Sequence, residues 1–295
     1  MNRIETLKGI IPATVTPLDQ QERFAPAAYE ALLERLYAAG VDGVYVCGQT
    51  GEGLLQTVEQ RKQVAESAVK NSPPGKTVIV HVGAHRTADA VELARHAARA
   101  GAAAVSALPP LGSYSFDEVR AYYEAVAAAS DAPLLVYYFP ESYPGVRTVE
   151  QVLDLCRIPN VVGLKYTDFD FYRMRTIKQS GAVLFNGRDE VLAPGLLMGA
   201  GGGIGTFYNV VPELFVELYG QAQRGDWDGA RATQDSINTI IRITLQFPCL
   251  PAIKQILRWR GIDCGPCIRP RGALTPEQAD ELGHLLDGDL AVSRT

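Results

Sequence analysis

Lys165 is the residue of this sequence whose surroundings best suit covalent chemistry. It stands near the end of the largely apolar run 160–167, between Pro159 and the acidic segment 168–170. A run of this length is typical of a buried parallel strand, so the amine would lie at the carboxyl end of that strand. Burial disfavours the charged form of an amine, and a neutral amine can attack a carbonyl carbon to form a Schiff base. The alternative interpretation is a lysine that extends from the strand end into water.

Polar residues also lie at or just after the ends of other predicted strands. They are Thr50 and Gly51 in the turn 48–53, Tyr137, Asp189 and Glu190 in the segment 187–190, and Thr206 after the glycine run 201–203. Backbone N–H groups of a glycine-rich turn and a threonine hydroxyl can hold a small carboxylate. Each segment also has a structural interpretation: a tight turn, an aromatic residue in a strand, or an acidic helix start that complements the helix dipole.

The order of predicted elements is strand, loop and helix, repeated. The predicted strands are 9–15, 43–47, 77–82, 103–108, 133–138, 160–167, 183–186 and 203–206. Apolar residues at helical spacing predict helices between them, with a capping box of Thr57 and Gln60, an N-cap at Ser115 and a C-cap at Gly101. Eight such units in about 220 residues favour an α/β fold of the (β/α)₈ TIM barrel type over a doubly wound sheet.

The last part of the chain lacks strand-like runs. Three helices are predicted there, at 227–247, 250–260 and 276–286. We therefore expect residues 1–225 to form the barrel and residues 226–295 a helical extension packed on it. In a TIM barrel the carboxyl ends of all strands share one face, and active sites lie on that face. This fold would bring the polar strand ends close to Lys165.

Composition bounds the class of function. The chain has 295 residues, of which 47% are hydrophobic and 21% charged, with a net charge of -5. Lys and Arg form no block, so neither nucleic acid nor an anionic membrane is an expected partner. No run of 18 apolar residues occurs and residues 1–5 lack the apolar region of a signal peptide, so we expect a cytoplasmic protein.

Two further patterns do not predict a cofactor. Cys264 and Cys267 have C-x-x-C spacing, but a second ligand pair and a thioredoxin-like setting are missing, so two incidental reduced thiols are favoured over a metal or redox site. The glycine run 201–203 contains no G-x-G-x-x-G, which argues against a dinucleotide. We expect neither a metal nor an organic cofactor.

Four ordered motifs carry a family resemblance. They are Gly48-x-Thr50-Gly51-Glu52, Tyr137-x-x-Pro140, Gly163-x-Lys165-x-Thr167 and Gly187-x-Asp189-Glu190. In this order and at these separations, they resemble the pyruvate-dependent class I aldolases of the dihydrodipicolinate synthase and N-acetylneuraminate lyase family. The resemblance extends from about Leu7 through the segment 267–270 and covers nearly the whole chain.

The resemblance implies a Schiff-base mechanism. Lys165 would form an imine with the ketone of pyruvate or of a 2-keto acid substrate, and Tyr137 would transfer a proton to or from the hydroxyl at the bond that breaks. Thr50 and the Gly51 amide would bind the substrate carboxylate. The implied binding residues are completed by Gln49, Thr167, Gly187, Asp189, Glu190 and Thr206. The resemblance also implies a homotetramer.

Within the family, the residues favour the N-acetylneuraminate lyase branch. Ser142 stands where the synthase branch usually carries an arginine, whereas Asp189 and Glu190 suit the hydroxyls of a sugar acid. Gln49 and Arg188 depart from the usual pattern, which leaves open a 2-keto-3-deoxy sugar acid aldolase or dehydratase, or a substrate with a second carboxylate. Dihydrodipicolinate synthase is a weaker alternative, and a keto-acid-binding protein without turnover is the weakest.

Overall fold

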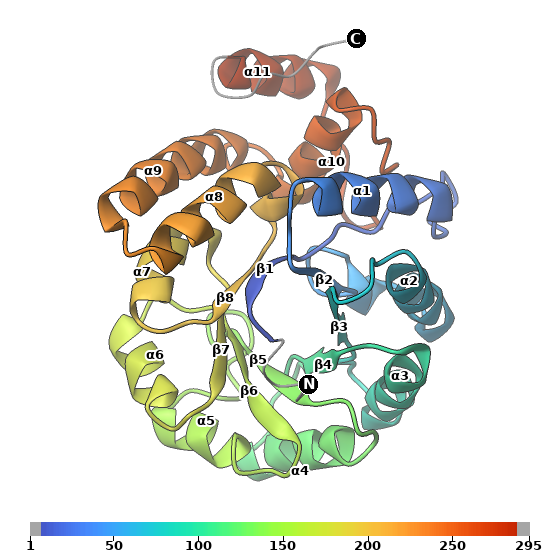
Figure 1. The fold of residues 1–295 in the computed structure, drawn as a ribbon. Helices are drawn as coiled ribbons and strands as arrows, with labels where there is room; N and C mark the ends of the chain where they lie inside the picture. Colours follow the sequence, from blue (N-terminus) through green and yellow to red (C-terminus); the bar gives the residue numbers. More distant parts are fainter. Residues whose placement is uncertain (1–6, 288–295) are drawn as a thin grey trace.

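The computed structural model describes residues 7–287, which contain an eight-stranded parallel barrel (Figure 1). The strands are β1 (Gly9–Pro12), β2 (Gly43–Val46), β3 (Thr77–His81), β4 (Ala104–Ala107), β5 (Leu134–Tyr138), β6 (Val161–Tyr166), β7 (Val183–Asn186) and β8 (Gly202–Gly205). Each pairs in parallel with its neighbour in the order β1-β8-β7-β6-β5-β4-β3-β2, and a bridge from Ala13 to Tyr45 joins the two ends. The expected TIM barrel is confirmed, and the doubly wound sheet is wrong.

Helices surround the barrel on its outer side (Figure 1). They are α1 (Pro26–Ala38), α2 (Val58–Lys70), α3 (Thr87–Ala100), α4 (Phe116–Ala127), α5 (Val149–Leu155), α6 (Phe171–Lys178), α7 (Leu192–Leu197) and α8 (Pro212–Gln223). The N-cap at Ser115 is confirmed, and Gly101 ends α3 with a φ of 100°. Thr57 caps α2, but within the described residues the Gln60 side chain accepts no hydrogen bond from the Thr57 N–H, so the second half of the predicted capping box is wrong. The Gln60 amide donates to the Glu22 carbonyl.

Two apolar layers hold these elements together. Alternate residues of each strand point inward or outward, so Tyr45 of β2 lies inside the barrel while Val44 and Val46 pack against the helices. Tyr137 of β5 and Phe185 of β7 also lie inside. The middle of the barrel is therefore filled by side chains, and the end at the carboxyl termini of the strands is where a TIM barrel binds its ligands.

Three more helices follow the barrel. They are α9 (Trp227–Thr244), α10 (Cys249–Trp259) and α11 (Pro276–Leu286), close to the predicted ranges. Figure 1 shows α9 outside α8, and α10 near the end of α1. The division into a barrel of residues 1–225 and an extension of residues 226–295 remains our proposal.

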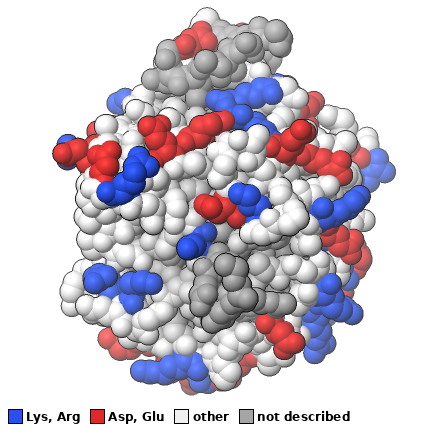
Figure 2. All heavy atoms as spheres, viewed as in Figure 1, with Lys and Arg blue, Asp and Glu red and all other residues white. Residues whose placement is uncertain are grey.

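No single helix within residues 7–287 is long and apolar enough to cross a membrane. Helices α9 and α10 meet such a criterion only as a pair, and they bend by 110° where they meet. Most of their isoleucine side chains, among them Ile237 and Ile253, are buried in the protein core. The prediction that residues 1–5 do not begin a signal peptide concerns residues outside the described range. On the face shown in Figure 2, basic and acidic side chains are interspersed among uncharged ones.

Candidate active site

Lys165 points into the barrel from β6. The strand register places it beside Tyr137 of β5 and Phe185 of β7, both of which face the interior. Its side chain is buried, and Nζ lies 3.9 Å from the ring centre of Tyr137 and 4.9 Å from that of Tyr45. Burial lowers the pKa of Lys165 to about 7, and the nearby Asp189 opposes this shift. The alternative of a lysine that extends into water is wrong, and a neutral, nucleophilic fraction exists near pH 7.

Aromatic neighbours hold the Tyr137 ring. It stacks on Phe139 with ring centres 6.2 Å apart and meets Tyr45 and His81 edge to face. Burial raises the pKa of the Tyr137 phenol, whereas the nearby Thr167 hydroxyl lowers it. The Thr167 Oγ1 is itself buried without a hydrogen bond of good geometry within the described residues. Tyr137 is therefore a fixed, protonated phenol beside the amine.

His81 of β3 supports this arrangement, and sequence reasoning missed it. Its Nε2 accepts a hydrogen bond from the Leu108 N–H, and its Nδ1 lies 3.1 Å from the Cys47 carbonyl oxygen. These two contacts assign the ring proton to Nδ1. Burial, together with the Arg61 charge, keeps the pKa of His81 well below its usual range. The neutral imidazole packs against the Tyr137 ring.

Asp189 follows β7 in a short 3₁₀ helix, η3 (Asp189–Val191), and is buried. Its Oδ2 accepts a hydrogen bond of 2.7 Å from the Phe207 N–H, which belongs to the loop after β8. A Cβ atom at Gly205 would lie 1.8 Å from Asp189 Oδ1, so only glycine permits this approach. Burial raises the pKa of Asp189 to about 7, and Lys165 opposes that rise. The side chain is thus held by the loop after β8, affects the pKa of Lys165 through its charge, and makes no cap on α7.

The turn after β2 brings Thr50 to the end of β8. Thr50 Oγ1 lies 2.7 Å from Thr206 Oγ1, so these two hydroxyls share a hydrogen bond. The Gly51 carbonyl accepts hydrogen bonds from the Thr16 hydroxyl and the Gln56 amide, at 2.8 Å and 2.6 Å. The turn is therefore fixed from several sides, as a preformed carboxylate site requires.

A buried ion pair anchors the same turn to the C-terminal part of the chain. Glu52 Oε2 lies 3.1 Å from Lys254 Nζ of α10, and both side chains are almost fully buried. Glu52 Oε1 accepts a hydrogen bond from the Ile268 N–H, and Lys254 also donates to the Pro266 carbonyl. Sequence reasoning missed Lys254, because it lies 202 positions from Glu52 and has no local signal.

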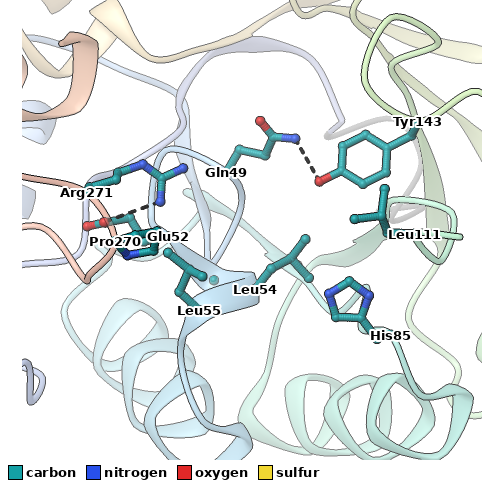
Figure 3. A pocket seen from close by; sticks show the side chains of 10 residues that line it. Gln49, Glu52, Leu54, Leu55, His85, Leu111, Tyr143, Pro270 and Arg271 are labelled. Atoms are coloured by element: carbon teal, nitrogen blue, oxygen red, sulfur yellow. Dashed lines mark hydrogen bonds and ion pairs between the residues drawn. The ribbon is translucent and has the colours of Figure 1, made fainter.

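The remaining predicted residues have different surroundings. The Gln49 amide donates to the Tyr143 hydroxyl at 3.1 Å, as Figure 3 shows. Gly187 approaches Thr167 so closely that a Cβ atom would lie 2.1 Å from its Oγ1. Glu190 lines a cavity of about 670 Å³ along α9, which none of the other predicted site residues lines.

Arg188 does not present a free charge. Its guanidinium forms an ion pair with Glu141 and lies 4.5 Å from the ring centre of Phe169 and 5.2 Å from that of Phe139. Glu141 thus already neutralises the charge with which Arg188 was expected to select a second carboxylate.

Two cavities open beside Gln49. One, of about 470 Å³, is lined by Tyr143, His85, Leu111 and Arg271 among others (Figure 3). The other, of about 380 Å³, is lined by Thr50, Thr206, Cys249 and Arg271 among others. The candidate carboxylate site thus lies at an accessible mouth of the barrel.

The described part of the chain holds no group of three or more His, Cys, Asp or Glu side chains arranged to bind a metal ion. Cys264 and Cys267 are free, buried thiols. Burial raises the pKa of Cys264 to about 12 and that of Cys267 to about 11, so both stay protonated and unreactive at neutral pH.

Comparison with known proteins decides the family. Residues 6–288 match the family model described as the dihydrodipicolinate synthetase family. The chain belongs to this family. It is 36% identical to an N-acetylneuraminate lyase of Rhizobium meliloti strain 1021 over 267 residues, which is 90% of this chain and 89% of that protein.

Solved structures of the dihydrodipicolinate synthetase family agree. The sialic acid aldolase of Ruminococcus gnavus superposes with a TM-score of 0.89 at 31% identity, covering 97% of this chain and 100% of that one. CdNal of Clostridium difficile, solved with mannosamine, gives a TM-score of 0.92 at 25% identity, covering 96% and 99%. The expected enzyme class, a pyruvate-dependent class I aldolase and thus a carbon–carbon lyase, is confirmed.

Proposed function

We propose that this enzyme cleaves a 2-keto sugar acid to pyruvate and an aldehyde through a Schiff base on Lys165. The observation that carries the proposal is the buried Lys165 amine, with a pKa of about 7, beside the Tyr137 phenol. N-acetylneuraminate, cleaved to pyruvate and N-acetylmannosamine, is the proposed substrate, because relatives at 34–36% identity are named N-acetylneuraminate lyase. The family resemblance also supports a homotetramer, and the sequence pattern supports a cytoplasmic location.

The first step is imine formation. The neutral amine of Lys165 attacks the keto carbon of the substrate to form a carbinolamine, which takes up one proton and loses one water molecule to leave a protonated imine. The Thr50 hydroxyl and the Gly51 N–H hold the substrate carboxylate, which pairs with the positive imine. Asp189 adds a nearby negative charge, and its position is secured by the Phe207 N–H. These groups favour the cationic intermediate.

The second step breaks the carbon–carbon bond. Electrons of that bond flow into the protonated imine and form an enamine, while the hydroxyl of the departing carbon loses its proton to Tyr137. The positive imine nitrogen forms close to the Tyr137 ring and lowers the pKa of the phenol, which makes its phenolate accessible as the base. Protonation of the enamine carbon and addition of water then release pyruvate and restore Lys165.

Binding of the substrate tail is assigned to the residues after β7 and β8. Carboxylates accept hydrogen bonds from vicinal hydroxyls, so Asp189, Glu190 and the Thr206 hydroxyl are proposed to hold the polyol. Gln49, Thr167 and Gly187 complete the pocket wall. The close contact of Gly187 with Thr167 supports this assignment, because it brings the ends of β6 and β7 together.

Covalent trapping tests the proposal. Incubation with pyruvate and borohydride should fix a pyruvyl adduct on Lys165, located by peptide mass spectrometry, and N-acetylneuraminate should release pyruvate in a coupled assay. Lys165→Met should abolish both signals, while Lys178→Met, which removes a lysine outside the barrel on α6, should leave both intact. An adduct on another lysine would overturn the mechanism. An adduct on Lys165 without release from N-acetylneuraminate would overturn only the substrate.

A further inference from the structure

Arg271 lies where the two cavities beside Gln49 meet. Both cavities are lined by Gln49 and Arg271, and the second is also lined by Thr50 and Thr206. Figure 3 shows Gln49 between Arg271 on one side and Tyr143 on the other. A ligand that is held at Thr50 and extends toward the mouth of the barrel therefore passes the Arg271 guanidinium.

The charge of Arg271 is not balanced by its partner. Arg271 Nη1 lies 3.7 Å from Glu52 Oε1, a distance too long for a good hydrogen bond. Glu52 makes shorter contacts with Lys254 Nζ at 3.1 Å and with the Ile268 N–H at 2.9 Å. Two cations thus share one carboxylate, and this group of three side chains carries a net positive charge.

The excess charge faces the cavities. The Glu52 and Lys254 side chains are 0% and 4% exposed, whereas the Arg271 side chain is 42% exposed. Among the described residues, no carboxylate other than Glu52 lines either cavity. A guanidinium in this position, with the Gln49 amide next to it, matches the geometry of a carboxylate.

Arg188 and Arg271 differ in this respect. The Arg188 guanidinium is paired with Glu141 and lies close to two aromatic rings, so its charge is used within the protein. Within residues 7–287, the one ion pair of Arg271 is the distant contact with Glu52, a carboxylate that Lys254 already neutralises. Of these two arginines, Arg271 is therefore the one whose charge is available to a ligand.

We propose that Arg271, assisted by Gln49, forms a second anion subsite, which binds a carboxylate at the far end of a 2-keto acid. The enzyme would then bind a 2-keto dicarboxylate more tightly than an unbranched 2-keto acid of the same chain length that ends in a methyl group. This inference rests on the proposed function in one respect only, since it takes the keto end of the ligand to be held at Thr50 and Lys165. It does not depend on N-acetylneuraminate as the substrate.

Matched ligand pairs test the subsite. 2-Oxoglutarate and 2-oxopentanoate differ only in the distal carboxylate, as do 2-oxoadipate and 2-oxohexanoate. Each acid is titrated by calorimetry and, separately, by borohydride trapping on Lys165 in competition with pyruvate. We expect the wild type to bind the dicarboxylate of at least one pair about tenfold more tightly or better, since a charged hydrogen bond is lost in its partner.

Three variants assign the preference. Arg271→Gln should reduce the ratio of affinities within the pair to near one, and Arg271→Lys should restore part of it. The control is Arg269→Gln, because Arg269 is 88% exposed, pairs with Glu22 and lines neither cavity. It should keep the wild-type ratio. Thermal unfolding of each variant verifies that the fold is intact.

Two results would overturn the subsite. One is equal affinity of the wild type for both members of both pairs, and the other is an unchanged ratio in Arg271→Gln. A failure of pyruvate to trap on Lys165 would instead overturn the proposed function. Calorimetry reports the ratio without imine trapping, so the two failures are distinguishable.

Discussion

The Nζ atom of Lys165 lies 3.9 Å from the ring centre of Tyr137, and the strand register fixes the two residues side by side on β6 and β5. The residues that we propose for the Schiff base and for the proton transfer thus lie on neighbouring strands. Because both side chains lie inside the barrel, both are shielded from bulk water. Their environment controls the chemistry.

The pH dependence of imine formation should report the Lys165 amine. Its pKa of about 7 means that the nucleophilic neutral form, and with it the rate of pyruvate trapping, increases as the pH rises through 7. Asp189 holds this pKa up, so Asp189→Asn should move the rise to lower pH. Trapping rates from pH 5 to 9 measure both curves. An identical curve in Asp189→Asn would show that the two groups do not interact.

The pH dependence of the free energy of unfolding should have opposite signs for Lys165 and Asp189. The pKa of Lys165 is depressed from a model-peptide value of 10.5, so the unfolded chain binds the extra proton between about pH 7 and 10, and this group makes stability rise with pH there. The pKa of Asp189 is raised from 3.8, so this group makes stability fall as the pH increases from about 4 to 7. Urea unfolding of the wild type, Lys165→Met and Asp189→Asn measures each contribution. Unchanged pH profiles in the two variants would contradict these shifts.

Tyr137→Phe should separate imine formation from cleavage. The ring and its aromatic contacts remain, but the hydroxyl that transfers the proton is lost, so cleavage should fall by roughly 10² or more. Pyruvate trapping should be affected less. Single-turnover cleavage and trapping rates are compared, with Tyr138→Phe as the matched control, because Tyr138 is the neighbouring tyrosine on β5. An equal loss of both rates would leave Tyr137 only a packing role.

Glu190→Gln tests the binding of the substrate tail. If Glu190 accepts hydrogen bonds from hydroxyls of the sugar acid, kcat/KM for N-acetylneuraminate should fall by a factor that corresponds to about 1 to 3 kcal/mol of lost transition-state stabilisation. Trapping of pyruvate, which has no tail, should fall much less. The position of Glu190 beside α9 makes a structural role the alternative. In that case thermal stability would fall and all substrates would lose activity alike.

The ion pair of Glu52 and Lys254 should be costly to break from one side. Glu52→Gln leaves the buried Lys254 charge unpaired, and we expect it to destabilise the fold by about 3 to 5 kcal/mol. Lys254→Met leaves the buried Glu52 with the Arg271 contact at 3.7 Å, so its loss of stability should be smaller. The double variant should be less destabilised than the sum of the singles, and denaturant titration measures this coupling. Since the pair anchors the Thr50 turn, both singles should also weaken pyruvate binding. Additive losses would show that the pair makes no mutual contribution.

Local sequence patterns determined the barrel and its central residue. Short apolar runs alternate with helical spacing along the chain, and each pattern depends only on neighbouring residues, so strand and helix positions follow from them. The run around Lys165 likewise predicted a buried strand, because its apolar neighbours adjoin it in sequence. The four motifs at strand ends predicted the family for the same reason.

Tertiary structure alone decided how distant side chains combine. Three contacts join segments that are far apart in the chain. They are the pairing of Glu52 with Lys254, the packing of His81 on Tyr137, and the approach of Arg271 to Glu52. Arg188 stands in one of the motifs, yet its neutralisation by Glu141 depends on how two separate loops meet above the barrel. Such contacts arise from burial and charge after the chain has closed on itself, and no local spacing encodes them.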